Sequence, residues 1–291
     1  MSPLFIAEIL ALVTAVLFAT GDFVGRLAIR HAPPYMGGLM SAAVGCVVFG
    51  AAWLAIPSSV PLNLPGVVWF FFAGLIHPAF GFIILLKAFE KAGVGRSAAI
   101  LGTGPFFSVA IAILFLGERP TWFVLGGTLL IVLGVVCVSL EEGTESPVKW
   151  RRLGYPFLTA FLFGLAPVLR KAGLNHIPSP MVGMAISSLS GTVCLLACAG
   201  FFPAGRRFSG NRRGVGLYAI SGTVFALGVY TYFAALEKGE VSVVVPLLFT
   251  HTLMLLVLVH FFLRQIERLT LRLAGGAVLI VCGAVIITTF G

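Results

Sequence analysis

Long apolar runs, separated by short polar breaks, fill almost the whole chain. A membrane-spanning helix needs about 20 consecutive, mostly apolar residues, and ten such runs lie between charge clusters and Pro- or Gly-rich turns. The predicted spans are residues 4–28, 35–56, 66–88, 95–116, 121–140, 153–172, 180–202, 214–236, 241–263 and 270–290. The pattern therefore predicts an all-α membrane protein with ten transmembrane helices.

The polar positions between these runs recur in the same order in both halves of the chain. Ala-Phe-Glu-Lys at 88–91 returns as Ala-Leu-Glu-Lys at 235–238, and Glu-Arg-Pro-Thr at 118–121 returns as Glu-Arg-Leu-Thr at 267–270. A Gly-Gly pair follows each Glu-Arg turn. Such internal similarity indicates duplication. We predict a first five-helix repeat at residues 1–140, a cytoplasmic linker at 141–152 and a second five-helix repeat at 153–291.

Basic residues are distributed unevenly between the loops. Of the 19 Lys and Arg residues, 15 fall in or beside odd-numbered loops, and cytoplasmic loops are the basic ones. This distribution places both termini on the extracytoplasmic side of the cell (inner) membrane. Because each repeat contains an odd number of spans, the two repeats are expected to cross the bilayer in opposite directions.

Composition narrows the function classes. Hydrophobic residues make up 59% of the 291 positions and charged residues 10%, whereas a soluble domain has roughly 25% charged residues. The basic residues behind the net charge of +9 lie in or beside the loops between spans, so we expect a lipid bilayer and no nucleic acid as partner. The five cysteines lie inside apolar runs, and even the closest pair, Cys194 and Cys198, has no His or carboxylate nearby in the sequence. We expect no metal and no cofactor.

The repeated landmarks also resemble a known family. The first helix of each half ends in a basic residue (Arg26 or Lys171), the third ends in Ala-x-Glu-Lys, and a Glu-Arg turn precedes the fifth. This pattern resembles the EamA group of the drug/metabolite transporter superfamily over nearly the whole chain. The resemblance implies two inverted repeats around a central cavity, lined mainly by helices 1, 3, 4, 6, 8 and 9. The chain departs from the family in its second helix, where an Arg is common and residues 40–42 read Met-Ser-Ala.

Inverted repeats are typical of secondary transporters, because two similar halves can exchange conformations and so alternate access to a shared site. We therefore expect an exporter or exchanger of a small metabolite such as an amino acid. The sequence contains no phosphate-binding loop for ATP, and no nucleophile or metal motif of an enzyme. A membrane-embedded lipid flippase or other lipid-handling protein remains the alternative, and a channel is a third class. The oligomeric state stays open.

Polar residues inside the spans are the candidates for the solute site. Asp22 is a carboxylate within a span, where charge is expensive, and either pairs with Arg26 one turn later or serves substrate or proton coupling. His77 directly precedes Pro78, which bends a helix and frees a carbonyl. His77 either bonds that carbonyl or contacts substrate, and proton coupling through Asp22, His77 or His251 is open.

The fourth and ninth spans carry matched candidates. Thr103 lies two positions before a proline, and Thr250 and His251 follow Pro246. Bent or broken helices at a repeat interface indicate a binding site, although small residues also serve packing. In the eighth span Tyr230 and Tyr232 are two apart, so at most one is expected to face the cavity. Arg26 and Lys171 are secondary candidates for the site.

Overall fold

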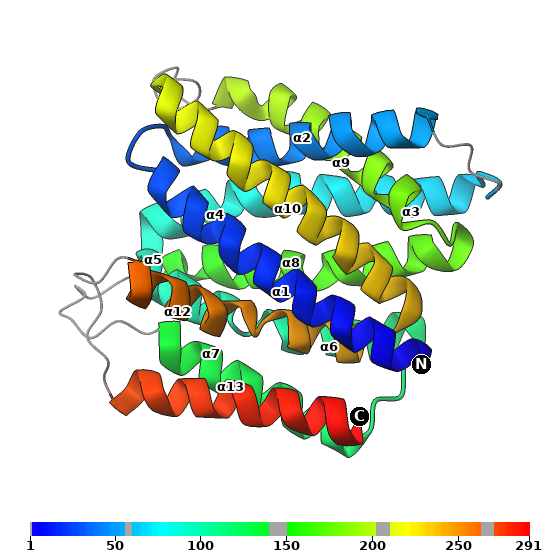
Figure 1. Cartoon of the computed structure of the whole chain (residues 1–291), viewed down its shortest axis with the longest axis vertical. Coiled ribbons are helices and arrows are strands. Elements are labelled where there is room, and N and C mark those ends of the chain that lie inside the picture. The colour runs from blue at the N-terminus through cyan, green and yellow to red at the C-terminus, as the bar shows by residue number, and fades with distance from the viewer. Residues whose placement is uncertain (1, 56–59, 140–149, 202–209, 263–270) are drawn as a thin grey trace.

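The computed structural model describes residues 2–55, 60–139, 150–201, 210–262 and 271–291. Within these ranges all regular structure is helical, and ten helical stretches are long and apolar enough to cross a membrane. The prediction of an all-α protein with ten spans is thus confirmed. Helix α1 begins and helix α13 ends at the same end of the bundle (Figure 1).

The first repeat contains five spans, of which two are interrupted. Two continuous helices are followed by a third span with a π-helical turn at its centre, a fourth span broken near its middle, and a continuous fifth span. In chain order the elements are α1 (Pro3–Ala28), α2 (Pro34–Ala55), α3 (Leu64–Gly74), η1 (Leu75–Phe80), α4 (Gly81–Ala92), α5 (Val94–Leu101), α6 (Gly104–Ile111), η2 (Ala112–Leu116) and α7 (Trp122–Ser139).

The second repeat has the same order of spans, with a break again in its fourth. Its elements are α8 (Trp150–His176), α9 (Pro180–Cys198), the short turn η3 (Ala199–Phe201), α10 (Arg212–Lys238), α11 (Val241–Leu248), α12 (His251–Phe262) and α13 (Leu271–Phe290). Helix α8 begins at Trp150, so residues 150–152 of the predicted linker are its first turn. The rest of that linker lies outside the described residues.

The two repeats are interlocked. The first helix of each repeat packs against the third span of the other, as α1 does on α10 and α8 on α3 and α4. The second spans pair with each other (α2 with α9), and so do the fifth (α7 with α13), which lie together at one edge of the bundle (Figure 1). Every major contact between the halves therefore has a counterpart. Spans 3, 6 and 8 meet in the interior.

Small residues allow the closest of these contacts. A side chain at Gly74 of α3 would come within 2.1 Å of the Ser187 carbonyl oxygen on α9. Ser187 and Ser190 in turn donate hydrogen bonds to the carbonyls of Phe70 (2.9 Å) and Phe71 (3.1 Å). Interhelical hydrogen bonds of this kind stabilise membrane helices, for which the lipid supplies no partners. They anchor α3 just before the point where the third span bends.

Candidate functional site

The third span bends at His77. Its backbone dihedral angles (φ −142°, ψ 116°) are not helical, and Pro78 follows within the π-helical turn η1. The non-helical dihedrals turn the peptide groups around His77 away from the regular helical pattern. A carbonyl in such a turn needs a partner from another helix, because lipid offers none. The sequence predicts this bend, and the structure supplies the partner.

That partner is Arg170 of α8. Its side chain is only 4% exposed. Nη2 donates to the His77 carbonyl oxygen at 3.3 Å and lies 3.1 Å from His77 Nδ1. Since a guanidinium can only donate, Nδ1 is the acceptor, and the His77 ring is neutral with its proton on Nε2. His77 therefore binds a cation from the other repeat.

Aromatic rings complete the surroundings of this cation. The guanidinium carbon lies 5.4 Å from the Tyr232 ring centroid and 5.3 Å from that of Phe233, both on α10. These separations suit cation–π attraction. The His77 ring in turn packs edge-to-face against Phe163 of α8, with ring centroids 4.8 Å apart. Spans 3, 6 and 8 thus contribute to a single centre, which we call the Arg170 centre (His77, Phe163, Arg170, Tyr232 and Phe233).

The two broken spans meet at the interface between the repeats. The fourth span breaks between α5 and α6, and the ninth between α11 and α12. Thr103 and Thr250 occupy the breaks, and each hydroxyl donates to the carbonyl three residues earlier, at 2.6 and 2.7 Å. A side chain at Gly104 would come within 2.9 Å of the Phe249 ring. The break in one repeat therefore lies against the break in the other.

His251 and Asp22 lie beside the second break. His251 begins α12, and its Nδ1 is 3.0 Å from the Leu248 carbonyl oxygen. Asp22 is half-buried on α1 and close enough to interact electrostatically with His251 and with Arg26. The described residues contain no salt bridge between Asp22 and Arg26, and Arg26 is exposed. Asp22 thus lacks the ion pair that was one of its two predicted roles.

Phe18 connects these two regions. Its ring centroid lies 6.5 Å from that of Tyr232 and 6.4 Å from that of His251. His77, Tyr232 and His251, predicted separately from three different spans, therefore line one continuous interior region. Thr103 and Thr250 reach the same interface, although both hydroxyls are already bonded within their own helices.

Two predicted residues lie apart from this interior region. Tyr230 is 37% exposed and stacks on Phe49 of α2, with ring centroids 5.1 Å apart. Lys171 points to the end of the bundle, where Nζ donates to the carbonyls of Leu236 (2.7 Å) and Gly239 (2.9 Å) and so caps the C-terminus of α10. Nearby, the buried carboxylate of Glu118 accepts the N–H groups of Val241 and Ser242 at the start of α11.

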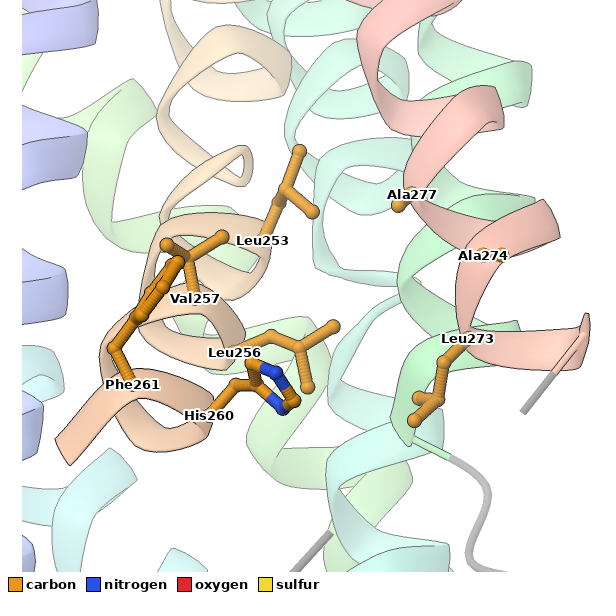
Figure 2. A pocket seen from close by; sticks show the side chains of 8 residues that line it. All are labelled: Leu253, Leu256, Val257, His260, Phe261, Leu273, Ala274 and Ala277. Atoms are coloured by element: carbon orange, nitrogen blue, oxygen red, sulfur yellow. The ribbon is translucent and has the colours of Figure 1, made fainter. Parts of the chain in front are cut away.

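Two pockets open on the flanks of the bundle. One lies between α12 and α13 and is lined by aliphatic side chains, the Phe261 ring and the imidazole of His260 (Figure 2). The other lies between α2 and α9 and is equally apolar. Exposed residues such as Leu54 (86%) and Phe261 (65%) border them. Neither pocket is lined by a residue of the Arg170 centre, so these pockets are not the predicted central cavity.

Comparison with known proteins places the chain in a family. The model of the EamA-like transporter family matches residues 5–140 and again residues 153–289. The chain belongs to the EamA-like transporter family. The resemblance read from the repeated landmarks is confirmed, and the chain is a multi-pass membrane protein of this family.

Individual relatives of this EamA-like transporter are more distant. It is 26% identical over 144 residues to the uncharacterized transporter YcbK of Bacillus subtilis (strain 168), a match that covers 45% of this chain and 46% of YcbK. It is 44% identical over 52 residues to the chloroplastic phosphoenolpyruvate/phosphate translocator 1 of Arabidopsis thaliana, covering 18% of this chain and 13% of the translocator. The chain thus matches less than half of each of these relatives.

A solved crystal structure shares the fold of this EamA-like transporter. It superimposes with a TM-score of 0.78 at 18% sequence identity, and the match covers 96% of this chain and 95% of the other. At this identity the likeness supports the architecture alone.

The sequence analysis missed the roles of two residues that connect the repeats of this EamA-like transporter, Arg170 and Glu118. Arg170 is not among the candidate residues of the sequence analysis, although it lies within the predicted sixth span, and it is buried within α8. Glu118 was noted as a landmark of the repeat, without a role, and proves to cap α11. The signal for Arg170 was its position inside an apolar run, because a cation there almost always faces the interior.

Proposed function

We propose that this EamA-like transporter exports or exchanges a small metabolite, such as an amino acid, by alternating access in the cell (inner) membrane. Its energy comes from a gradient or from exchange rather than from ATP hydrolysis. Both termini lie on the extracytoplasmic side in this proposal. The family supplies the general activity, and the geometry at the repeat interface supports the mechanism.

The contact between the two broken spans carries the proposal. Each repeat contributes one interrupted helix, and the breaks meet where Gly104 lies against Phe249. Interrupted helices at the interface of inverted repeats can move their two segments separately, and their free backbone groups are available to a solute. The interior region beside the breaks carries His77, Tyr232 and His251, polar groups that can bind a solute or a proton.

Counterflow into proteoliposomes tests this function. Vesicles that contain the purified chain are loaded with an unlabelled amino acid mixture, and entry of one labelled amino acid is followed without ATP. We expect entry that saturates with concentration and that falls when the internal amino acids are omitted. Because the plant relative is named for phosphoenolpyruvate and phosphate, phosphate-bearing anions belong in the same series. Entry that rises linearly with concentration for every solute would indicate a pore and would overturn the proposal.

Proton coupling is the form of energy input that Asp22, His77 and His251 support. The carboxylate of Asp22 lies within electrostatic range of the His251 imidazole, so a change of charge on either group affects proton binding by the other. We expect Asp22→Asn and His251→Gln each to abolish the stimulation of uptake by an imposed pH gradient. Counterflow without a gradient should persist in both variants. Equal stimulation in the wild type and in Asp22→Asn, His77→Gln and His251→Gln would exclude coupling through these groups.

A further inference from the structure

Arg170 is a buried cation that has no counter-ion among the described residues. No carboxylate in the described part of the chain forms a salt bridge with it. Nη2 donates to the carbonyl oxygen of His77 and lies against the ring nitrogen of the same residue, whereas Nε is buried and has no hydrogen-bond partner in the described ranges. A buried donor of this kind is rare in folded proteins and needs a reason.

The aromatic faces and the carbonyl do not neutralise the charge. Cation–π contacts with Tyr232 and Phe233 and one hydrogen bond to a carbonyl attract the guanidinium, but all of these partners are uncharged. A clamp on the bent third span would need a hydrogen-bond donor, and a neutral Gln would supply one without the cost of burying a charge. The positive charge and the spare Nε therefore point to an additional, negatively charged partner.

We propose that Arg170 is the anion-binding group of the transport site and that the transported solute carries a carboxylate or a phosphate. This proposal rests on the proposed function and specifies the substrate class. Nε and a neighbouring terminal nitrogen form one edge of the guanidinium, the geometry with which Arg binds an oxyanion through two parallel hydrogen bonds. The aromatic rings of Phe163 and Tyr232 offer apolar surface for the rest of the solute.

The location of Arg170 fits this role. The centre combines α8 and α10 of the second repeat with η1 of the first. An anion bound there contacts both repeats, so its binding energy depends on how the repeats are arranged. A solute that binds the arrangements unequally shifts the equilibrium between them. The anion competes with His77 for Nη2, which links solute binding to the bend of the third span.

Thermal unfolding of the purified full-length chain with matched solute pairs tests the proposal. Each pair compares a solute that carries a carboxylate or a phosphate with a close analogue that lacks this group: benzoate with benzamide, L-leucine with L-leucinamide, and glycerol 3-phosphate with glycerol. We expect the unfolding temperature to rise with at least one solute that carries the anionic group and not with its analogue, because bound ligand stabilises the folded state. The pair that responds distinguishes a carboxylate from a phosphate.

Variants at Arg170 connect this response to the guanidinium. Arg170→Gln should weaken binding of the responding anion by about 10- to 100-fold, the usual effect of losing a charge-assisted hydrogen bond. Arg170→Lys keeps the positive charge but loses the two parallel N–H donors of the guanidinium, so its affinity for the anion should lie between those of the wild type and Arg170→Gln. Arg30→Gln, the same change at an exposed residue near the end of the first span, should leave binding unchanged. Unaltered affinity in Arg170→Gln would overturn the proposal.

The test remains decisive if Arg170→Gln does not fold. The solute pairs are then compared on the wild type and on Arg170→Lys alone. Equal stabilisation by a solute that carries the anionic group and by its analogue contradicts the proposal. Counterflow separates this outcome from the function itself. Saturable exchange only of solutes that lack both a carboxylate and a phosphate leaves the transporter mechanism intact and refutes the anion site. Anion binding without any exchange refutes the transporter mechanism and leaves the anion site.

Discussion

Two tyrosines of α10 show how strongly side-chain direction decides a residue's environment. Tyr232 is 4% exposed and lies against the Arg170 guanidinium, whereas Tyr230, two positions earlier, is 37% exposed and stacks on Phe49. A helix turns about 100° per residue, so positions two apart face nearly opposite ways. Only the inner tyrosine can contact a solute in the interior.

Replacement of each tyrosine by leucine tests this difference. Tyr232→Leu removes the ring that faces the guanidinium and should raise the KM of transport by about 5- to 30-fold, which corresponds to roughly 1–2 kcal/mol of a desolvated cation–π contact. Tyr230→Leu should leave KM within about twofold of the wild type by the same scale. The measurement is saturable counterflow in proteoliposomes. Equal effects of the two variants would show that the interior region does not include the solute path.

Side-chain direction also explains why the sequence analysis selected His77 and Tyr232 and passed over Arg170. His77 is marked by the proline beside it, and Tyr232 by its polar group within an apolar run. Arg170 and Lys171 are adjacent cations near the end of a span, and either could point to the end of the bundle. Their directions depend on which neighbours pack against α8, and the structure turns Arg170 inward and Lys171 toward Gly239.

At the scale of helices, the glycine pairs of α7 and α13 determine how closely the fifth spans approach. A side chain at Gly127 would lie 2.8 Å from the Gly283 carbonyl oxygen, and one at Gly276 would lie 2.9 Å from that of Gly134. The neighbouring glycine of each sequence pair has open space around it. The sequence identifies both Gly-Gly pairs, but it cannot tell which member faces the partner helix.

Alanine substitutions within each pair separate packing from helix propensity. Gly127→Ala and Gly276→Ala should lower the unfolding temperature, because the new methyl group meets backbone atoms and forces the helices apart at a cost of about 1–3 kcal/mol. Gly126→Ala and Gly275→Ala meet nothing within 4 Å and should be neutral or slightly stabilising. If all four variants unfolded at the same temperature, close packing of α7 on α13 would not contribute to stability.

The broken spans show a further limit of sequence reasoning at this scale. Prolines near the middle of spans 4 and 9 predict bends, but the positions of the breaks differ. Pro105 lies in the first turn of α6, where its missing N–H is not needed, so the break precedes it. Pro246 lies inside α11, and the break follows it. The same residue type therefore produces similar interruptions by different local geometry.

At the scale of the whole molecule, the number and order of the spans could be predicted because the bilayer imposes an apolar length on each. The pairing of the spans could not. A span such as α7 is apolar on every side, so its sequence carries no stripe that marks a partner helix. The structure shows that each first helix packs on the third span of the other repeat. This interlocking brings Arg170 against His77 and builds the centre from both repeats.

The orientation of this architecture in the membrane remains a prediction that labelling can test. In a background in which the five native cysteines are replaced, single cysteines are introduced as Ser2→Cys, Ser146→Cys and Gly291→Cys. A membrane-impermeant maleimide applied to intact cells should label the first and third variants. It should label Ser146→Cys only after lysis, because basic loops stay in the cytoplasm. Labelling of Ser2→Cys and Gly291→Cys from different sides would contradict the ten-span topology.

Alternating access requires the two repeats to exchange conformations. In this structure Glu118 caps α11 through Val241 N (2.8 Å) and Ser242 N (2.9 Å), and so ties the turn before the fifth span to the start of the ninth. Its counterpart in the sequence repeat is Glu267, which lies outside the described residues. If the repeats alternate, Glu267 should cap the start of α5 in the opposite state. Glu118 and Glu267 would then favour closure of opposite ends.

Glu118→Gln and Glu267→Gln should therefore shift accessibility in opposite directions. Loss of a charged cap costs about 1–2 kcal/mol, enough to change the ratio of the two states by roughly 5- to 30-fold. The reporter is Phe18→Cys in the cysteine-free background, in the region between Tyr232 and His251, labelled from either side of sealed vesicles. Glu118→Gln should speed labelling from the end where α10 terminates, and Glu267→Gln from the other end. A shift in the same direction for both variants would mean that the two carboxylates stabilise a single state, and the halves would not exchange roles.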